Sequence, residues 1–225
     1  AGGNAVDAAI AVGFALSVTF PNAGNLGGGG FMVIRTAEGE VNSIDFREVA
    51  PENAHRDMYV DENGDVIPGM SLYTTHAAGV PGTVAGFGAA HEKYGTKSWN
   101  YLLRPAIKLA SNGFELSYRD AMYLNASRSY FLRDEEAAKI FAKEDRYSVG
   151  DLFIQKDLAK TLRRISVGGA EEFYTGITTD MIQSCMSRTG GIITKNDLAS
   201  YKAVEREPIE FDYRGYTFYS MPPAS

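Results

Sequence analysis

The sequence predicts a mixed fold of helices and strands, of the α+β or layered α/β class, with a middle part that is rich in helices. Segments with the alternating pattern of β-strands occur near the start and near the end of the 225 residues, and helical periodicity fills the stretch between them. A chain of this length can bury a sizeable core. We therefore expect residues 1–225 to form a single domain whose sheet is assembled from distant parts of the chain.

The first element is an apolar helix. Asn4 is a good N-cap, and Asp7 stands in the first turn, where the helix dipole favours a negative charge. The apolar stretch from Ala8 to Phe20 has 13 residues, which is too short to span a bilayer. Pro21 ends the helix. Because the helix is apolar on nearly every side, it must be covered by protein all round.

A β-hairpin follows the glycine-rich run NAGNLGGGG. The segments 31–35 and 41–47 flank a polar turn in which Gly39 supplies a positive φ. In the second strand the side chains of Asp45 and Arg47 share one face. One face of this strand is therefore expected to pack in the protein interior. The other face, which carries the charged side chains, is available for binding or catalysis.

The segment DENGD at residues 61–65 looks like the start of a calcium loop, but the match fails. Its glycine is at the fourth position rather than the sixth, and Leu72 stands at the twelfth, where a bidentate Glu is needed. We therefore interpret this segment as a turn.

Helices are predicted through the middle of the chain. A turn at 79–82 feeds a helix that ends at Gly95, and the helix that starts at Ser98 is kinked or split at Pro105. Further helices are expected at 117–128, 135–142, 155–167, 170–174 and 177–188, followed by a short helix that Thr194 and Asp197 cap. The chain finishes on strands at 202–206, 208–213 and 216–221, with a hairpin turn at Arg214 and Gly215.

Charge and cysteine content narrow the class of function. The net charge of −6 comes from interleaved acidic and basic residues, so a nucleic acid or a membrane surface has little to hold. The one cysteine, Cys185, rules out an internal disulfide, and we interpret it as a small buried hydrophobe on the apolar face of a helix. A single cysteine does not indicate whether the protein works in an oxidising or a reducing compartment.

The glycine run resembles a phosphate cradle, but its order is inverted. A cradle needs glycines that follow a strand and open a helix, whereas here a helix precedes the run and a strand follows it. The sequence also has no Gly-Lys-Ser/Thr motif at this point. A nucleotide site is therefore disfavoured, and we expect the glycines to let two backbone segments pack closely.

Two candidates for chemistry remain. Thr74 and His76 are two residues apart, but no third group that would orient the histidine is evident, so we interpret them as part of a loop. The histidines of the chain also lack metal-ligand spacing. Arg47 is expected where its strand ends, with Asp45 on the same face and Glu48 next to it to hold the guanidinium. Such an arginine can present a bidentate fork to a small carboxylate, although taken alone it is more often in a surface ion pair.

Five blocks of sequence, in order, resemble one family: GGNAVDAAIAVGFALSVTFPNAGNLGGGGFMVIR, IDFREVAP, GVPGTVAGF, GGIITKNDLASYKAVEREPI and DYRGYTFYSMPPAS. They resemble the large-subunit portion of γ-glutamyltranspeptidase, and the similarity is loosest between Glu115 and Lys156. The resemblance implies the N-terminal, large-subunit portion of a longer precursor. It also implies part of the α/β/β/α sandwich of N-terminal nucleophile hydrolases, incomplete without a small subunit that is cut from the same precursor.

The resemblance further implies a reaction. Family members use a Thr, freed at the start of the small subunit, to transfer the γ-glutamyl group of glutathione or related compounds to water or to amino-acid and peptide acceptors. Its usual setting is a Thr-Thr-His-aromatic-Ser pattern. Thr74, Thr75 and His76 resemble the first three letters, but Ala77 follows, so Thr75 is not expected to be the nucleophile. The nucleophile is expected beyond Ser225, and this chain alone is expected to be inactive.

Arg47 matches the family arginine that grips the α-carboxylate of the γ-glutamyl donor, and we interpret Glu48 as its support. We expect no cofactor and no metal, a small-subunit partner, a γ-glutamyl small-molecule substrate, and neither nucleic-acid binding nor a membrane span. The resemblance also implies a periplasmic or secreted location. Alternatives stay open: a glutaryl-side-chain β-lactam acylase, a poly-γ-glutamate-processing relative, or a homologue that has lost its nucleophile and is not catalytic.

Overall fold

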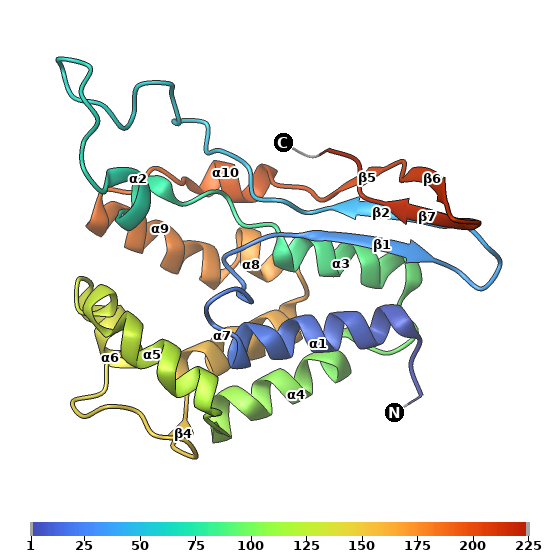
Figure 1. Ribbon diagram of the computed structural model, residues 1–225, viewed down its shortest axis with the longest axis horizontal. Helices are drawn as coiled ribbons and strands as arrows, with labels where there is room; N and C mark the ends of the chain where they lie inside the picture. The colour runs from blue at the N-terminus through green and yellow to red at the C-terminus, as the bar shows by residue number, and fades with distance from the viewer. Residues whose placement is uncertain (1, 224–225) are drawn as a thin grey trace. The chain divides into compact units, whose positions relative to one another are not determined.

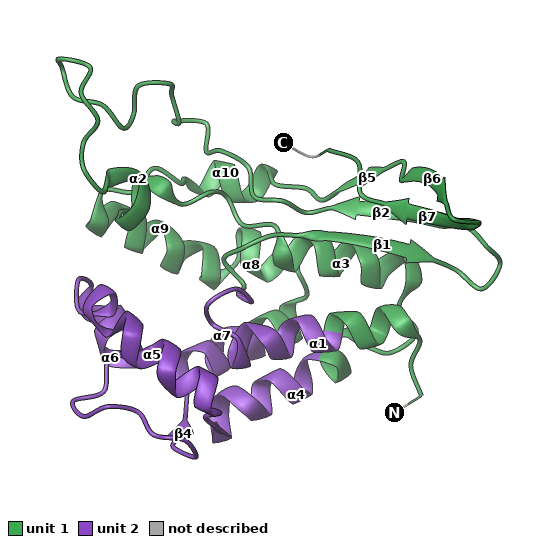
Figure 2. Cartoon of the chain, in the orientation of Figure 1, with its two compact units in different colours: residues 1–10, 26–102, 164–225 green, residues 11–25, 103–163 purple. Residues whose placement is uncertain are grey.

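The computed structural model describes residues 2–223. Contacts within the chain divide it into two compact units, which Figure 2 distinguishes by colour. Unit 1 comprises residues 1–10, 26–102 and 164–225, and unit 2 comprises residues 11–25 and 103–163. The expectation that residues 1–225 form a single domain stays a prediction.

The sheet of unit 1 joins strands from both ends of the sequence (Figure 1). Its order is β1 (Phe31–Arg35), β2 (Val41–Asp45) and β5 (Val204–Arg206), and both pairings are antiparallel. Ser43 pairs with Arg206, and Asp45 pairs with Val204. The predicted sheet from distant segments is therefore present. The last two strands, β6 (Ile209–Tyr213) and β7 (Tyr216–Ser220), form a separate two-stranded sheet instead of extending it.

Helix α3 (Thr83–Tyr94) packs against the sheet of unit 1. Phe87 of α3 meets Phe46 edge to face, with the ring centroids 5.8 Å apart. Gly86 allows this approach, because a Cβ added there would overlap the ring of Phe46. The segment that follows β2 is thereby held against the first turn of α3.

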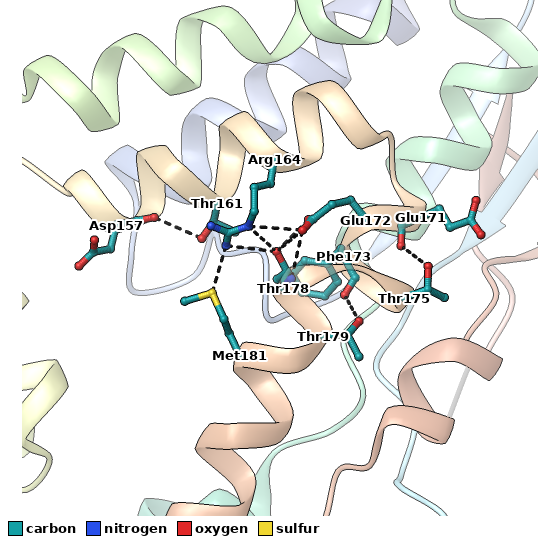
Figure 3. A network of polar contacts seen from close by, with 10 residues as sticks. All are labelled: Asp157, Thr161, Arg164, Glu171, Glu172, Phe173, Thr175, Thr178, Thr179 and Met181. Carbon is teal, nitrogen blue, oxygen red and sulfur yellow. Dashed lines mark hydrogen bonds and ion pairs between the residues drawn. The ribbon is translucent and has the colours of Figure 1, made fainter.

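Three further helices of unit 1 follow one another closely along the chain: α8 (Glu171–Thr175), α9 (Ile177–Thr189) and α10 (Lys195–Ser200). Arg164 contacts Glu172 at 3.3 Å, and Glu172 accepts hydrogen bonds from the hydroxyl and the N–H of Thr178 (Figure 3). Arg164 and Glu172 are largely buried, so this network joins the starts of α8 and α9 firmly. Thr194 and Asp197 form the predicted capping box of α10.

Unit 2 contains a hydrophobic cluster that is rich in aromatic side chains. Helices α5 (Tyr118–Phe131) and α6 (Glu135–Phe141) accompany a short antiparallel pair, β3 (Phe114–Glu115) with β4 (Leu152–Phe153), which the sequence pattern does not predict. The buried members of this cluster are Leu116, Ala121, Leu124 and Phe153, with Phe114, Phe131, Phe141 and Tyr147 packed around them.

Three helices contribute residues to both units: α1 (Ala5–Thr19), α4 (Trp99–Asn112) and α7 (Lys156–Gly168). Helix α4 is continuous and contains Pro105, so of the predicted kink or split at that residue the split is wrong and the kink stays a prediction. The remaining elements are the short helix α2 (Met70–Tyr73) and a 3₁₀ turn at Thr75–Ala77. The predicted mixed fold of helices and strands is confirmed. Within residues 2–223, no helix has both the length and the apolar character that a membrane crossing requires.

Candidate functional site

The backbone of Arg47 is held on both sides by side chains. Strand β2 ends at Asp45, so Arg47 lies two residues beyond the strand rather than at its end. The N–H of Arg47 donates to Oδ1 of Asp45 at 2.9 Å, and the carbonyl of Arg47 accepts from the hydroxyl of Tyr201 at 2.8 Å. The side chain of Arg47 nevertheless stays 55% exposed. The main chain is fixed while the guanidinium can still be reached from solvent.

Asp45 does not hold the guanidinium of Arg47, so this part of the sequence interpretation is wrong. The Asp45 carboxylate is buried and accepts from Nε of Arg206 at 2.7 Å through its other oxygen. The nearest ion-pair contact of Arg47 is with Glu48, where Nε and Oε2 lie 3.9 Å apart. At that distance and exposure the pair contributes little to stability. Arg47 is therefore free to exchange this contact for one with a bound carboxylate.

Tyr201 is anchored by a second tyrosine. Its ring stacks on that of Tyr174, with the centroids 5.7 Å apart and the planes 10° apart. The hydroxyl of Tyr174 donates to the carbonyl of Pro81 at 2.9 Å and accepts from the N–H of Ala85 at 3.1 Å. Burial, together with the negative charges of Asp45 and Glu48, raises the pKa of Tyr201 to about 12. Tyr201 is consequently a hydrogen-bond donor at neutral pH.

The glycines allow the backbone around Arg47 to be approached from two directions. Gly30 and Phe46 exchange backbone hydrogen bonds of 3.2 and 3.0 Å, and a Cβ on Gly29 would overlap the Phe46 carbonyl. The carbonyl of Gly28 accepts from the N–H groups of Gly82 and Thr83 at 2.8 and 3.0 Å, at the start of α3. These donors are thus used within the protein, and the glycine run acts as a support for the segment that carries Arg47.

The other candidates have structural partners. Thr74 precedes the 3₁₀ turn that contains His76, and its hydroxyl donates to the carbonyl of Met70 at 2.7 Å. The hydroxyl of Thr75 donates to the carbonyl of Thr189 at 3.2 Å. Oδ1 of Asp61 accepts from two backbone N–H groups inside DENGD, at 2.9 and 3.0 Å, which confirms the turn. Among the residues that the structure describes, no group of three His, Cys, Asp or Glu side chains could hold a metal ion. Cys185 is only partly buried.

Sequence reasoning missed Tyr201 and Arg206. They lie 154 and 161 residues after their partners Arg47 and Asp45, and the contacts depend on the pairing of β2 with β5. The alternating pattern at 202–206 predicts a strand there, but it does not say which strand is its neighbour. A known pairing of β2 with β5 would have placed Arg206 near Asp45 and brought the segment that precedes β5, which contains Tyr201, toward Arg47.

Comparison with known proteins identifies the class and then the family. The chain is 52% identical over 226 residues to the glutathione hydrolase proenzyme of Escherichia coli (strain K12), covering 100% of this chain and 39% of that protein. The structure of Helicobacter pylori γ-glutamyltranspeptidase matches with a TM-score of 0.97 at 52% identity, covering 100% of this chain and 65% of that one. The fold is therefore that of an N-terminal nucleophile hydrolase. Residues 1–225 also match the sequence model of the family described as Gamma-glutamyltranspeptidase, and the chain belongs to this family.

A more distant likeness concerns one of the alternatives. The structure of cephalosporin acylase from Bacillus halodurans matches with a TM-score of 0.87 at 29% identity, covering 99% of this chain and 42% of that one. The acylase thus shares the fold, but it is less similar in sequence than the glutathione hydrolase proenzyme from E. coli.

Proposed function

We propose that the complete protein is a γ-glutamyl transferase and hydrolase and that this chain supplies the site for the α-carboxylate of the donor. The observation that supports this most directly is Arg47, whose main chain is fixed by Asp45 and Tyr201 while its guanidinium stays exposed. The family to which the chain belongs, and relatives named glutathione hydrolase proenzyme, support the choice of a γ-glutamyl donor.

The chemistry of the site suits a carboxylate. A guanidinium offers two parallel N–H groups to the two oxygens of a carboxylate, and such charge-assisted pairs are about twice as strong as neutral hydrogen bonds. Glu48 stands beside Arg47, with its Oε2 3.9 Å from Nε of the guanidinium. Arg47 and Glu48 are therefore the substrate-binding residue and its support in this proposal.

The rest of the reaction is assigned to residues outside this chain. The donor amide is attacked by the hydroxyl of an N-terminal Thr in the small subunit, which gives a γ-glutamyl ester that water or an amine then resolves. The small subunit is cut from the same precursor, in keeping with relatives that carry the word proenzyme in their names. We also propose a periplasmic or secreted location, which rests on the family resemblance alone.

The test is the turnover of γ-glutamyl 4-nitroanilide by the complete protein, with Arg47→Ala compared to the unchanged sequence. Loss of a charge-assisted hydrogen bond costs about 1.5–3 kcal/mol, so kcat/KM is expected to fall roughly ten- to 150-fold. The matched control is a donor that lacks the α-carboxylate, 4-aminobutyryl 4-nitroanilide, on which the substitution is expected to have little effect. Equal losses on both donors would contradict the carboxylate site, and unchanged turnover of the first donor would exclude it.

An acylase that removes glutaryl side chains from β-lactams is the second candidate, because the cephalosporin acylase structure shares the fold. It would also need a cation for the free carboxylate of its substrate. Parallel assays of the complete protein with γ-glutamyl 4-nitroanilide and with a glutaryl-β-lactam separate the two functions. A higher kcat/KM for the β-lactam would favour the acylase.

A further inference from the structure

We infer that Tyr201 is a positioning residue for Arg47 and that its hydroxyl sets the direction in which the guanidinium meets the donor carboxylate. This inference rests on the proposed function of Arg47. It assigns a role to Tyr201, which does not contact the substrate. Tyr201 acts only through the main chain of Arg47, the residue that binds the substrate.

The first step of the argument is the position of Arg47 beyond the strand. Strand β2 ends at Asp45, so the ladder of hydrogen bonds with β1 and β5 does not reach Arg47. Its N–H and its carbonyl are bound instead by the side chains of Asp45 and Tyr201. Since the direction of a side chain follows from its backbone, these two bonds fix where the Arg47 side chain starts.

The second step is that Tyr201 is itself fixed. Its N–H donates to the carbonyl of Leu198 at 3.1 Å at the end of α10, and its ring stacks on Tyr174. Gly82 leaves space for the Tyr201 hydroxyl, because a Cβ there would overlap both that oxygen and the carbonyl of Phe46. The hydroxyl is therefore held in one place between the start of α3 and the Arg47 carbonyl.

The third step distinguishes the contact made by the Tyr201 hydroxyl from the contact made by its ring. The ring of Tyr201 packs on Tyr174, whereas the hydroxyl oxygen makes the hydrogen bond to Arg47. Phenylalanine at this position keeps the stacked ring and loses only that hydrogen bond. Tyr201→Phe is consequently a selective test, since a purely structural role would reside mostly in the ring.

The experiment is a double-mutant cycle in the complete protein, made of the unchanged sequence, Tyr201→Phe, Arg47→Ala and the double variant. The readout is kcat and KM for γ-glutamyl 4-nitroanilide. Tyr201→Phe is expected to lower kcat/KM about three- to tenfold in the presence of Arg47, mainly through a higher KM. In the Arg47→Ala background the same substitution is expected to have less than about a twofold effect, because no guanidinium is left to position.

The control is Tyr118→Phe, which removes a hydroxyl from a residue that is 72% exposed in unit 2 and is expected to leave kcat/KM unchanged. An equal loss from Tyr201→Phe with and without Arg47 would overturn the inference and leave the proposed function standing. No loss in either background would overturn it as well. If Arg47→Ala alone has no effect, the proposed function fails, and the inference fails with it.

A second variant covers the case in which Tyr201→Phe does not fold. Tyr174→Phe keeps the hydroxyl of Tyr201 but removes the two hydrogen bonds that anchor the stacked neighbour. It is expected to lower kcat/KM about two- to threefold only when Arg47 is present. A loss that persists in the Arg47→Ala background would count against a positioning role for the tyrosine pair.

Discussion

The buried carboxylate of Asp45 is paired with Arg206, 161 residues further along the chain, and not with the side chain of Arg47, two residues away. The pairing matters for the site because an unpaired Asp45 would attract the nearest available cation. With Arg206 bound to it at 2.7 Å, the negative charge is largely offset. The guanidinium of Arg47 is therefore not bound by Asp45.

Removal of Arg206 is therefore expected to damage both stability and donor binding. Arg206→Ala leaves the buried Asp45 without its ion-pair partner and should lower the free energy of unfolding by about 1–3 kcal/mol, as measured by urea denaturation. The KM for the γ-glutamyl donor should rise as Asp45 draws Arg47 toward itself. The control is Arg56→Ala, since that side chain is 95% exposed and its ion pair is with the exposed neighbour Asp57. Equal behaviour of the two variants would contradict the assigned role.

The buried carboxylate of Asp7 gives a prediction about pH. Burial acts to raise the pKa of Asp7, but hydrogen bonds from the Thr96 hydroxyl and from the N–H groups of Asn4, Thr96 and Lys97 outweigh it. The net effect holds the pKa of this carboxyl well below its usual range. A carboxyl with a lowered pKa in the folded state stabilises the fold above its unfolded pKa of about 3.9, and this stabilisation is lost as the pH falls.

Asp7→Asn is accordingly expected to lower the free energy of unfolding by about 1–3 kcal/mol at pH 7, because the charged acceptor of these hydrogen bonds is lost. The difference between the two proteins should shrink below about pH 5 as Asp7 becomes protonated in the unfolded chain. Urea denaturation at a series of pH values measures this, with Asp57→Asn as an exposed charge-matched control. A difference that stays constant down to pH 3 would show that the charge of Asp7 is not what stabilises the fold.

Gly82 is predicted to be the least replaceable glycine near Arg47. In Gly82→Ala the new Cβ would overlap the Phe46 carbonyl and the Tyr201 hydroxyl, so the backbone that carries Arg47 must shift. We expect a loss of about 3 kcal/mol in the free energy of unfolding. Gly39→Ala is the comparison, because its φ of +95° is unfavourable for Ala but nothing lies within 4 Å of the added Cβ, which limits its cost to about 1–2 kcal/mol. Thermal denaturation ranks the two, and a smaller loss for Gly82→Ala would rule out the steric argument.

Thr75 is predicted to be dispensable for turnover. Its hydroxyl donates to the carbonyl of Thr189, so Thr75→Val should cost about 0.5–1.5 kcal/mol of stability. The kcat for the γ-glutamyl anilide should stay within about twofold of the unchanged protein. A loss of several orders of magnitude in kcat is the effect expected for a nucleophile, and it would show that Thr75 is catalytic.

The local features of the fold were predictable, because they depend on residues close together in the sequence. Asn4 with Asp7 and Thr194 with Asp197 form the caps that their spacing predicts. Gly95 caps the end of α3. The hairpin turn is made by Arg214 and Gly215, and these two residues have positive φ. These signals act within one turn of helix or one hairpin, where a few dihedral angles decide the outcome.

The partners of the candidate site were not predictable in the same way. Arg47 could be selected from its own neighbourhood, but the exposure of its guanidinium depends on Arg206 and its backbone geometry on Tyr201. Both depend on the long-range pairing of β2 with β5, for which the sequence has no local signal. The assignment of Asp45 to Arg47 was wrong for the same reason, since the cation that pairs with Asp45 comes from a distant strand.

The hydrogen bond between Tyr201 and Arg47 also has a consequence for the order of events at the ribosome. The two residues are separated by 154 positions, and synthesis at about 5–20 residues per second makes Tyr201 roughly 8 to 30 s after Arg47. During that interval the nascent segment around Arg47 lacks both Tyr201 and the cation that neutralises Asp45. The surroundings of Arg47 are therefore completed only after translation has passed residue 206, however early the hairpin of β1 and β2 forms.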